Sequence, residues 1–187
     1  RQIVRKRTDA RMIEVDPVVR PMYVEIAGPD ISDPGETLKA ALRTQWDIDA
    51  MIPCAVLAPW PEGADGVTVA LREEKIITAL WPGFREHLVG LSVDIGSTTV
   101  AAQLSNLGSG EILSEAGMMN PQIRFGEDVM SRISHIMMNP GSGAELTRVI
   151  RRAVGDLAAE CAAQAGLDRR DIVEVTVVGN PIMHHIF

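Results

Sequence analysis

The most informative stretch of the sequence is Gly90-Leu91-Ser92-Val93-Asp94-Ile95-Gly96-Ser97-Thr98-Thr99-Val100-Ala101. Up to Ile95, apolar residues alternate with small or polar ones, and this period of two predicts a strand with one face committed to a core. The polar residues that follow predict a turn, and residues 100–104 predict a second strand. A second turn at residues 106–110 leads into residues 111–116. The sequence therefore predicts three consecutive antiparallel strands.

Residues that could bind a phosphate are concentrated in the first turn, Asp94-Ile95-Gly96-Ser97-Thr98-Thr99. An acidic residue at the end of a buried strand can hold Mg²⁺ through its waters, a glycine lets a phosphate approach the backbone, and hydroxyl residues offer donors. Together these features fit the phosphate tail of a nucleotide. An ordinary hairpin turn is the alternative, because Gly, Ser and Thr are common turn residues. The segment is neither a Walker A loop nor a Rossmann fingerprint, since it lacks GxxxxGK[ST] and GxGxxG.

After the three strands, the sequence predicts two helices, one strand and the start of a third helix. Apolar residues at helical spacing predict helices over residues 129–137 and 146–161. Residues 172–178 predict a buried strand, after which Asn180 and Pro181 suit the N-cap and the first position of a helix. The order β-β-β-α-α-β-α predicts a mixed sheet with helical cover.

A connection containing Pro and Gly at residues 81–87 separates this half from a smaller one. The smaller half is predicted to contain a strand over 22–27, a helix opened by Asp33-Pro34-Gly35-Glu36, a short helix over 50–58 and a hairpin of 67–71 with 76–81. These elements predict a small α+β module without a phosphate loop, metal-ligand spacing or acid–base cluster. The basic residues at its start are predicted to be a solvated strand or linker; they are Arg1, Arg5, Lys6, Arg7 and Arg11.

Composition excludes several classes of protein. The 187 residues are 46% hydrophobic and 23% charged, which is ordinary for a globular chain of one or two domains. The formal net charge of -7 gives no general attraction to nucleic acid or to an anionic membrane. The longest largely apolar stretch, residues 50–61, is interrupted by prolines and is too short to span a bilayer. We therefore expect a cytoplasmic protein that binds neither nucleic acid nor membrane.

The two cysteines and the ends of the chain add two further expectations. Cys54 and Cys161 lie outside any CxxC or Cys/His pattern and are predicted to be buried thiols. The chain begins at Arg1 rather than Met, and it stops at Phe187 within what is predicted to be a newly begun helix. These features suggest a fragment of a longer protein.

Four stretches of this sequence resemble motifs of one known family. Residues 90–101 resemble the first phosphate motif of the acetate and sugar kinase, Hsp70 and actin superfamily. Three further stretches, in this order and spacing, resemble one branch of it, the reductive activators of corrinoid proteins, also called corrinoid activating enzymes. These stretches are Asn120-Pro121-Gln122, Phe125-Gly126-Glu127-Asp128-Val129-Met130-Ser131-Arg132-Ile133 and Gly179-Asn180-Pro181-Ile182-Met183-His184-His185.

The resemblance implies a domain organisation for the whole chain. Residues 1–21 correspond to a linker, residues 22–84 to a middle α+β domain, and residues 85–187 to the N-terminal part of an actin-like (ribonuclease H-like) ATPase domain, its first β-β-β-α-α-β elements. Family members also carry a plant-type 2Fe-2S domain, whose C-x₄-C-x₂-C ligand run is absent here. They need a second ATPase half with further nucleotide motifs. The chain alone is therefore expected to be inactive.

The resemblance also implies an activity for the full-length protein. An electron passes from the iron-sulfur cluster to a Co(II) corrinoid on a partner methyl-transfer protein, and ATP makes this unfavourable step possible. Asp94 would organise Mg²⁺ through water, and Gly96, Ser97, Thr98 and Thr99 would hold the β- and γ-phosphates of ATP. The sequence does not decide whether the protein is a homodimer, and it does not identify the corrinoid partner or its methyl donor.

The remaining polar residues of these motifs have structural alternatives. Local hydrogen bonding in a turn accounts for Asn120 and Gln122, with a nucleotide or partner role as the alternative. Helix capping accounts for Glu127 and Asp128, placed in the first turn of a helix, with magnesium ligation as the alternative. The adjacent His184 and His185 lie on different faces of a helix and do not readily bind one metal together, and His135 is isolated. Two other functions remain open for the protein: a small-molecule kinase of the same superfamily, and a non-catalytic protein-interaction module.

Overall fold

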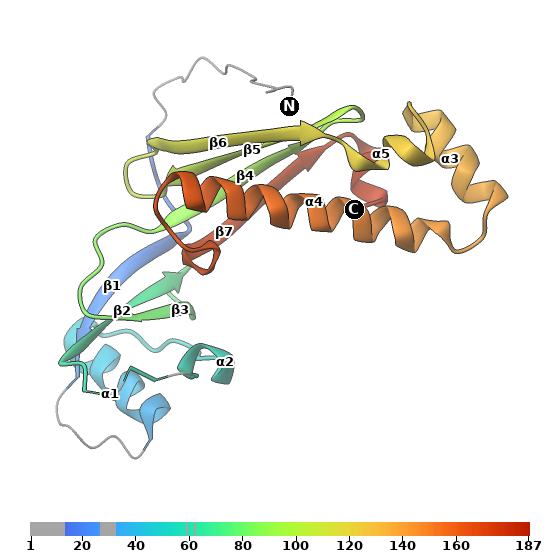
Figure 1. The fold of residues 1–187 in the computed structure, drawn as a ribbon. Coiled ribbons are helices and arrows are strands. Elements are labelled where there is room, and N and C mark those ends of the chain that lie inside the picture. Colours follow the sequence, from blue (N-terminus) through green and yellow to red (C-terminus); the bar gives the residue numbers. More distant parts are fainter. Residues whose placement is uncertain (1–13, 27–32, 59, 62) are drawn as a thin grey trace. The chain divides into compact units, whose positions relative to one another are not determined.

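The computed structural model describes residues 14–26, 33–58, 60–61 and 63–187 (Figure 1). These residues form two compact units. The N-terminal unit comprises residues 14–88 with 107–110, and the C-terminal unit comprises residues 89–106 with 111–187. The predicted basic linker at residues 1–11 lies outside the described residues.

The N-terminal unit contains a three-stranded antiparallel sheet in the order β1-β2-β3 and two helices. Its elements are β1 (Val19–Glu25), α1 (Pro34–Trp46), α2 (Cys54–Leu57), β2 (Gly66–Arg72) and β3 (Ile76–Pro82). The predicted hairpin and the predicted start of α1 are confirmed, whereas β1 begins at Val19 rather than at residue 22. The helix predicted over residues 50–58 is a single turn in the structure. Pro53 is its N-cap, and proline disfavours the helical conformation of the residue that precedes it.

Helix α1 packs against the sheet of the N-terminal unit through one apolar face. Leu38 and Leu42 lie one turn apart, and both are fully buried with Val24, Val67 and Ile77. Burying a side chain of this size stabilises the folded state by about 1.5–3 kcal/mol relative to leaving it exposed. The small core of this unit therefore depends on α1 keeping its position.

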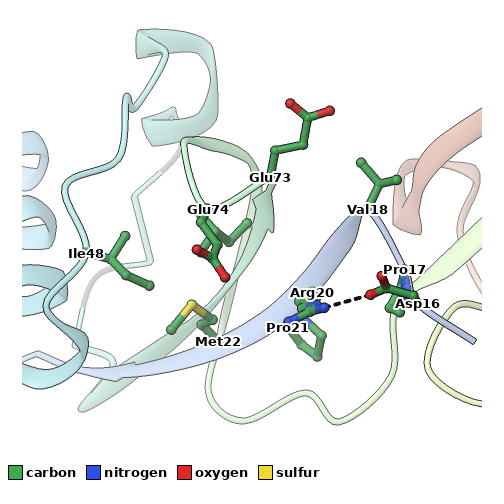
Figure 2. Close-up of a pocket in the computed structure, with 10 residues that line it drawn as sticks. Asp16, Pro17, Val18, Arg20, Pro21, Met22, Ile48, Glu73 and Glu74 are labelled. Carbon is green, nitrogen blue, oxygen red and sulfur yellow. Dashed lines mark hydrogen bonds and ion pairs between the residues drawn. The ribbon is translucent and has the colours of Figure 1, made fainter.

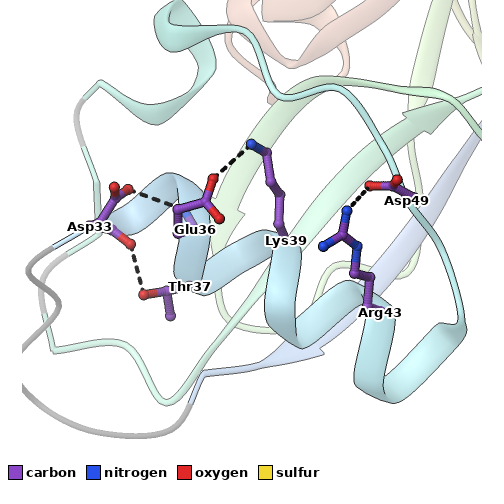
Figure 3. A network of polar contacts seen from close by, with 6 residues as sticks. All are labelled: Asp33, Glu36, Thr37, Lys39, Arg43 and Asp49. Carbon is purple, nitrogen blue, oxygen red and sulfur yellow. Dashed lines mark hydrogen bonds and ion pairs between the residues drawn. The ribbon is translucent and has the colours of Figure 1, made fainter.

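The start of α1 is fixed by a side-chain cap (Figure 3). Asp33 Oδ1 accepts a hydrogen bond of 3.1 Å from the Glu36 backbone N–H, as the sequence predicts. Lys39 pairs with Glu36 at 2.8 Å, and Arg43 pairs with Asp49 at 2.8 Å. These ion pairs are largely exposed and contribute little, whereas the cap satisfies a backbone donor that has no partner within the helix.

We expect Asp33→Ala to lower the free energy of unfolding by about 1 kcal/mol, because the Glu36 N–H loses its acceptor. Urea unfolding followed by circular dichroism measures this change. Asp49→Ala is the matched control, since it removes only an exposed ion pair and should cost less than about 0.5 kcal/mol. Equal effects of the two substitutions would contradict the capping role.

The N-terminal unit also contains a pocket of about 440 Å³ beside β1 and the turn between β2 and β3 (Figure 2). Met22 and Ile48 give its lining an apolar part, while Asp16, Glu73 and Glu74 give it acidic groups. Glu73 and Glu74 occupy the left-handed region, with φ of 50° and 57°. Arg20, which also lines the pocket, pairs with Asp16 at 2.7 Å, and Glu73 and Glu74 leave the lining with more acidic than basic groups, so a nucleotide phosphate site in this pocket is unfavourable.

The C-terminal unit contains a four-stranded sheet in the order β6-β5-β4-β7. Strands β4 (Val89–Ile95), β5 (Thr99–Asn106) and β6 (Ile112–Met119) are antiparallel neighbours, so the three predicted strands are confirmed. Strand β7 (Ile172–Gly179) runs parallel to β4. The other elements are α3 (Val129–Met138), α4 (Ser142–Gln164), α5 (Pro181–His185) and the 3₁₀ turns η1 (Pro121–Phe125) and η2 (Arg169–Asp171).

Helix α4 covers one face of this sheet (Figure 1). Its side chains Leu146, Ile150 and Leu157 are fully buried, and they share a core with Val93 and Val100 from β4 and β5. Because side chains alternate along a strand, the residues between these buried ones lie on the opposite face. Asp94 is one of them.

Three details differ from the sequence predictions. Strand β7 is not buried: Val175 and Val178 are 48% and 55% exposed, because β7 pairs only with β4 and ends the described part of the sheet. Cys54 is exposed on the single-turn helix α2, although Cys161 is buried as predicted. The last helix ends at His185 rather than continuing to the end of the chain.

No helix within the described ranges combines the length and the apolar character needed to cross a membrane.

Candidate functional site

The candidate site is the turn between β4 and β5, which contains Gly96, Ser97 and Thr98. Asp94 lies just before it on β4, half-buried and on the sheet face away from α4. Its register partners are Ala101 on β5 and Val178 on β7. Asp94 therefore stands at the end of its strand, beside the turn, as the sequence predicts.

The turn is held from one side through three consecutive carbonyl groups. The Asn120 side-chain amide donates to the Gly96 carbonyl at 2.8 Å, and the Asn120 backbone N–H donates to the Thr98 carbonyl at 2.8 Å. Between them, Arg132 Nη2 donates to the Ser97 carbonyl. All three carbonyl groups thus face Asn120 and Arg132.

The orientation of these carbonyl groups fixes the direction of the next N–H groups. In a trans peptide, the C=O of one residue and the N–H of the next point in opposite directions. The N–H groups of Ser97, Thr98 and Thr99 are therefore turned away from Asn120 and Arg132. In the part of the chain that the structure describes, the Ser97 and Thr98 N–H groups donate no hydrogen bond. Successive amide donors on one side of a turn are typical of an anion-binding backbone.

Gly96 closes the turn tightly. Its N–H donates to the Thr99 carbonyl at 2.8 Å, and a Cβ added at position 96 would lie 2.9 Å from that carbonyl oxygen. Because real Cβ atoms essentially never come this close to another heavy atom, a side chain at position 96 would distort the turn. The glycine predicted to admit a phosphate is thus also needed for the turn itself.

Asn120 and Gln122 are buried hydrogen-bonding residues of η1, 1% and 0% exposed. Asn120 Oδ1 accepts from the Gln122 backbone N–H at 2.9 Å, so Asn120 both caps η1 and binds the turn. Gln122 Nε2 donates to the carbonyl groups of Leu146 and Ile186, each at 3.1 Å. The predicted local hydrogen bonding is confirmed for Asn120, which also reaches the candidate site, whereas the Gln122 side chain bonds residues 24 and 64 positions away in the sequence.

Asp128 caps helix α3. Its Oδ1 accepts from the Ser131 backbone N–H at 2.7 Å, and hydrogen bonds from Ser131 lower the pKa of the Asp128 carboxyl. The predicted capping role is confirmed for Asp128. Its predicted place in the first turn is wrong, because α3 begins at Val129; Asp128 is the N-cap and Glu127 precedes it.

His135 lies apart from the adjacent pair His184 and His185. His184 and His185 are neighbouring exposed residues of α5, while the His135 ring packs against Phe125 with 5.3 Å between ring centres. Within the described residues, no group of three or more His, Cys, Asp or Glu side chains could hold a metal ion. Asp94 is the acidic residue that precedes the turn on β4.

Arg132 is the residue of this site to which the sequence analysis gave no role. Arg132 is charged and yet fully buried, and on α3 it lies at helical spacing from the apolar residues Val129 and Ile136 and next to Ile133. A charged residue at a position that helical spacing assigns to the core is the signal that could have identified it.

Comparisons with known proteins agree over nearly the whole chain. The model of the RACo linker region matches residues 8–87, and the model of the RACo middle region matches residues 89–187. The corrinoid activation enzyme RamQ of Eubacterium limosum is 31% identical over 127 residues, which are 67% of this chain and 21% of RamQ. The solved structure of a reductive activator for corrinoid, iron-sulfur protein matches with a TM-score of 0.73 and 28% identity, over 95% of this chain and 30% of that one. The chain thus spans less than a third of each of these two proteins.

Proposed function

Because the chain belongs to the RACo family, we propose that it is part of a protein that activates corrinoid proteins by ATP-dependent reduction. In this proposal, the full-length protein transfers an electron from an iron-sulfur cluster to the Co(II) corrinoid of a methyl-transfer partner, and ATP drives the step. The names of two relatives, a corrinoid activation enzyme and a reductive activator for a corrinoid, iron-sulfur protein, support the choice of partner.

The observation that carries the ATP part of the proposal is the direction of the backbone at the turn. Asn120 and Arg132 hold three consecutive carbonyl groups, so the amide groups of Ser97 and Thr98, which donate no hydrogen bond within the described residues, are available on the other side. We propose that these amides and the hydroxyl groups of Ser97, Thr98 and Thr99 hold the β- and γ-phosphates of ATP, and that Gly96 lets the phosphates approach because it has no side chain. Binding energy would then come from charge-assisted hydrogen bonds, which are stronger than neutral ones.

Asp94 suits Mg²⁺ better than a metal with an all-protein cage. Mg²⁺ usually keeps several waters and is bound through one or two carboxylates together with substrate phosphates. A single carboxylate beside a phosphate-binding turn fits this pattern, and the cation would neutralise phosphate charge. We propose that Asp94 orients the ion through its waters.

The two cysteines of this chain do not fit an iron-sulfur cluster. A 2Fe-2S cluster of the plant type needs four cysteine thiolates, whereas this chain has two cysteines. Cys54 is exposed in the N-terminal unit, and burial raises the pKa of the Cys161 thiol in the C-terminal unit. The cluster of the proposed reaction therefore has to be held by residues outside this sequence.

We propose the following assignment of the chain to parts of the protein. The proposal follows the two units rather than the bounds 1–21, 22–84 and 85–187, because residues 19–21 are part of β1 and residues 85–88 belong to the N-terminal unit. The N-terminal unit, which the RACo linker model covers, is an α+β domain that positions partners, and the C-terminal unit is the N-terminal part of an actin-like ATPase domain. The meander β4-β5-β6, the parallel strand β7 and the helix α4 on one face support the last assignment. The protein is proposed to act in the cytoplasm.

The proposal is tested with the full-length protein, its cluster reduced, and a corrinoid partner in the Co(II) state. We expect Co(I) absorbance to develop with Mg-ATP and phosphate to be released, and Co(I) to stay near background without nucleotide. A parallel assay that offers sugars and carboxylic acids as phosphate acceptors tests the kinase alternative. Equal Co(I) formation with and without ATP would contradict the ATP-driven mechanism, and failure to bind ATP would favour a protein-interaction module.

A further inference from the structure

The guanidinium of Arg132 is enclosed by neutral acceptors. Its side chain is 0% exposed. Nε donates to the Gly126 carbonyl at 3.0 Å, and Nη1 contacts Gln122 Oε1 and Met183 Sδ, each at 3.5 Å. The remaining nitrogen, Nη2, donates to the Ser97 carbonyl of the candidate phosphate turn. The guanidinium thus joins η1, α5 and the start of α3 to that turn.

This buried charge has no ion-pair partner in the described part of the chain. Burial lowers the pKa of the Arg132 guanidinium, and the negative charge of Asp128 offsets part of this effect. Asp128 is exposed and already accepts from the Ser131 N–H, so it compensates the charge weakly. Arginine stays protonated in proteins, and an uncompensated buried charge is costly.

The charge of Arg132 acts on the backbone N–H groups on the opposite side of the turn. A single peptide group separates Nη2, bound to the Ser97 carbonyl, from the Thr98 N–H, which points the opposite way. A positive charge at the carbonyl end polarises this peptide group and makes the N–H end more positive. Such fixed polarisation favours an anion placed at the N–H.

We propose that Arg132 is a positioning residue whose buried charge is compensated by the polyphosphate of a nucleotide bound on the other side of the Ser97–Thr98 peptide group. Arg132 does not touch the ligand; it orients the turn and raises its affinity for anions. The inference rests on the proposed ATP site and deepens it. Arg132 then strengthens the binding of the phosphate chain of ATP and has no effect on the binding of the nucleoside.

The first test uses the wild-type full-length protein and inorganic tripolyphosphate with Mg²⁺. We expect tripolyphosphate to raise the melting temperature and to compete with ATP, and adenosine at the same concentration to do neither. If ATP itself does not bind, the proposed function fails. If ATP binds but tripolyphosphate neither stabilises the protein nor competes, the proposed function stands and the role of Arg132 is wrong.

The second test compares Arg132→Gln with Arg132→Lys by isothermal titration with Mg-ATP and with adenosine. Removing the charge should weaken ATP binding by about 10- to 100-fold and leave adenosine binding unchanged, as expected for a hydrogen bond to a charged group. Lysine keeps the charge but loses the planar fork, so it should restore ATP affinity to within about tenfold of wild type. Arg148→Gln, at an exposed arginine of α4, is the matched control and should bind ATP like the wild type.

A purely structural role for Arg132 predicts a different pattern. Both substitutions would then lower the melting temperature, and the folded fraction would bind ATP and adenosine with wild-type affinities. That result, or ATP binding by a folded Arg132→Lys more than 100-fold weaker than wild type, would overturn the inference. If neither variant folds, the tripolyphosphate result on the wild type decides.

Discussion

Asp94→Ala in the full-length protein is expected to abolish ATP-dependent corrinoid reduction, with a loss of at least about 100-fold, while the fold stays intact. Asp94 lies at the end of β4, half-buried and on the sheet face away from the α4 core. Removing its carboxylate would leave the proposed Mg²⁺ without a protein group to orient its waters.

Two companions make this result specific. Asp94→Asn keeps the size of the side chain and removes its charge, so it should lose nearly as much activity as the alanine variant. Ser92→Ala changes the same face of the same strand, two residues before Asp94, and should stay within about twofold of wild type because Ser92 is exposed. Phosphate release and Co(I) absorbance measure all three variants. Rates near wild type in Asp94→Ala would reject the assignment.

Local sequence signals predicted much of this fold, because the physics that decides those elements is local. The alternation before Asp94 gave β4, since a strand with one buried face needs a period of two. Asp33 and Asn180 were predicted as caps, and each accepts backbone N–H groups at the start of its helix. The Asp94–Thr99 turn was likewise identified from residue types that suit a phosphate-binding turn.

The features that the sequence did not predict depend on the tertiary surroundings. Arg132 is buried because acceptors from η1, α5 and two turns converge on it, and helical periodicity contains no information about them. The exposure of Val175 follows from the place of β7 at the end of the described sheet, which an apolar run alone does not reveal. Cys54 is exposed for a similar reason, since its one-turn helix buries no residue.

The role of Asn120 combines both kinds of information. Its hydrogen bond within η1 is local, and the sequence predicted local hydrogen bonding in a turn here, whereas its two hydrogen bonds to the turn between β4 and β5 join residues 24 and 22 positions apart in the sequence. The same side chain therefore fixes a local helical turn and a distant loop. This coupling gives a physical reason why the motifs at residues 94–99 and 120–133 occur together in one site.

Gly126→Ala is expected to disrupt the candidate site indirectly, through Arg132. Its effect on the protein should be the second largest of the predicted effects, after that of Asp94→Ala. A Cβ at position 126 would lie 2.7 Å from the Arg132 backbone N, from the Ser131 carbonyl carbon and from Ser131 Cβ. Two of these atoms belong to the backbone at the start of α3, so the helix has to shift. Overpacking of this kind costs about 1–3 kcal/mol, and the shift would also move the Arg132 guanidinium from the Ser97 carbonyl.

Urea unfolding of the C-terminal unit within the 187-residue chain measures the first effect, and ATP titration of the full-length protein measures the second. Gly155→Ala in α4 is the matched control: its Cβ would meet only Arg169 Nη1, at 3.9 Å, an ordinary contact. Alanine is favoured over glycine by about 1 kcal/mol inside a helix, so this control should stabilise the same unit. Both substitutions add the same methyl group, so the opposite signs of their effects on the free energy of unfolding follow from how close other atoms lie to each added Cβ. If Gly126→Ala unfolds at the wild-type urea concentration and keeps wild-type ATP affinity, the start of α3 does not position the turn through Arg132.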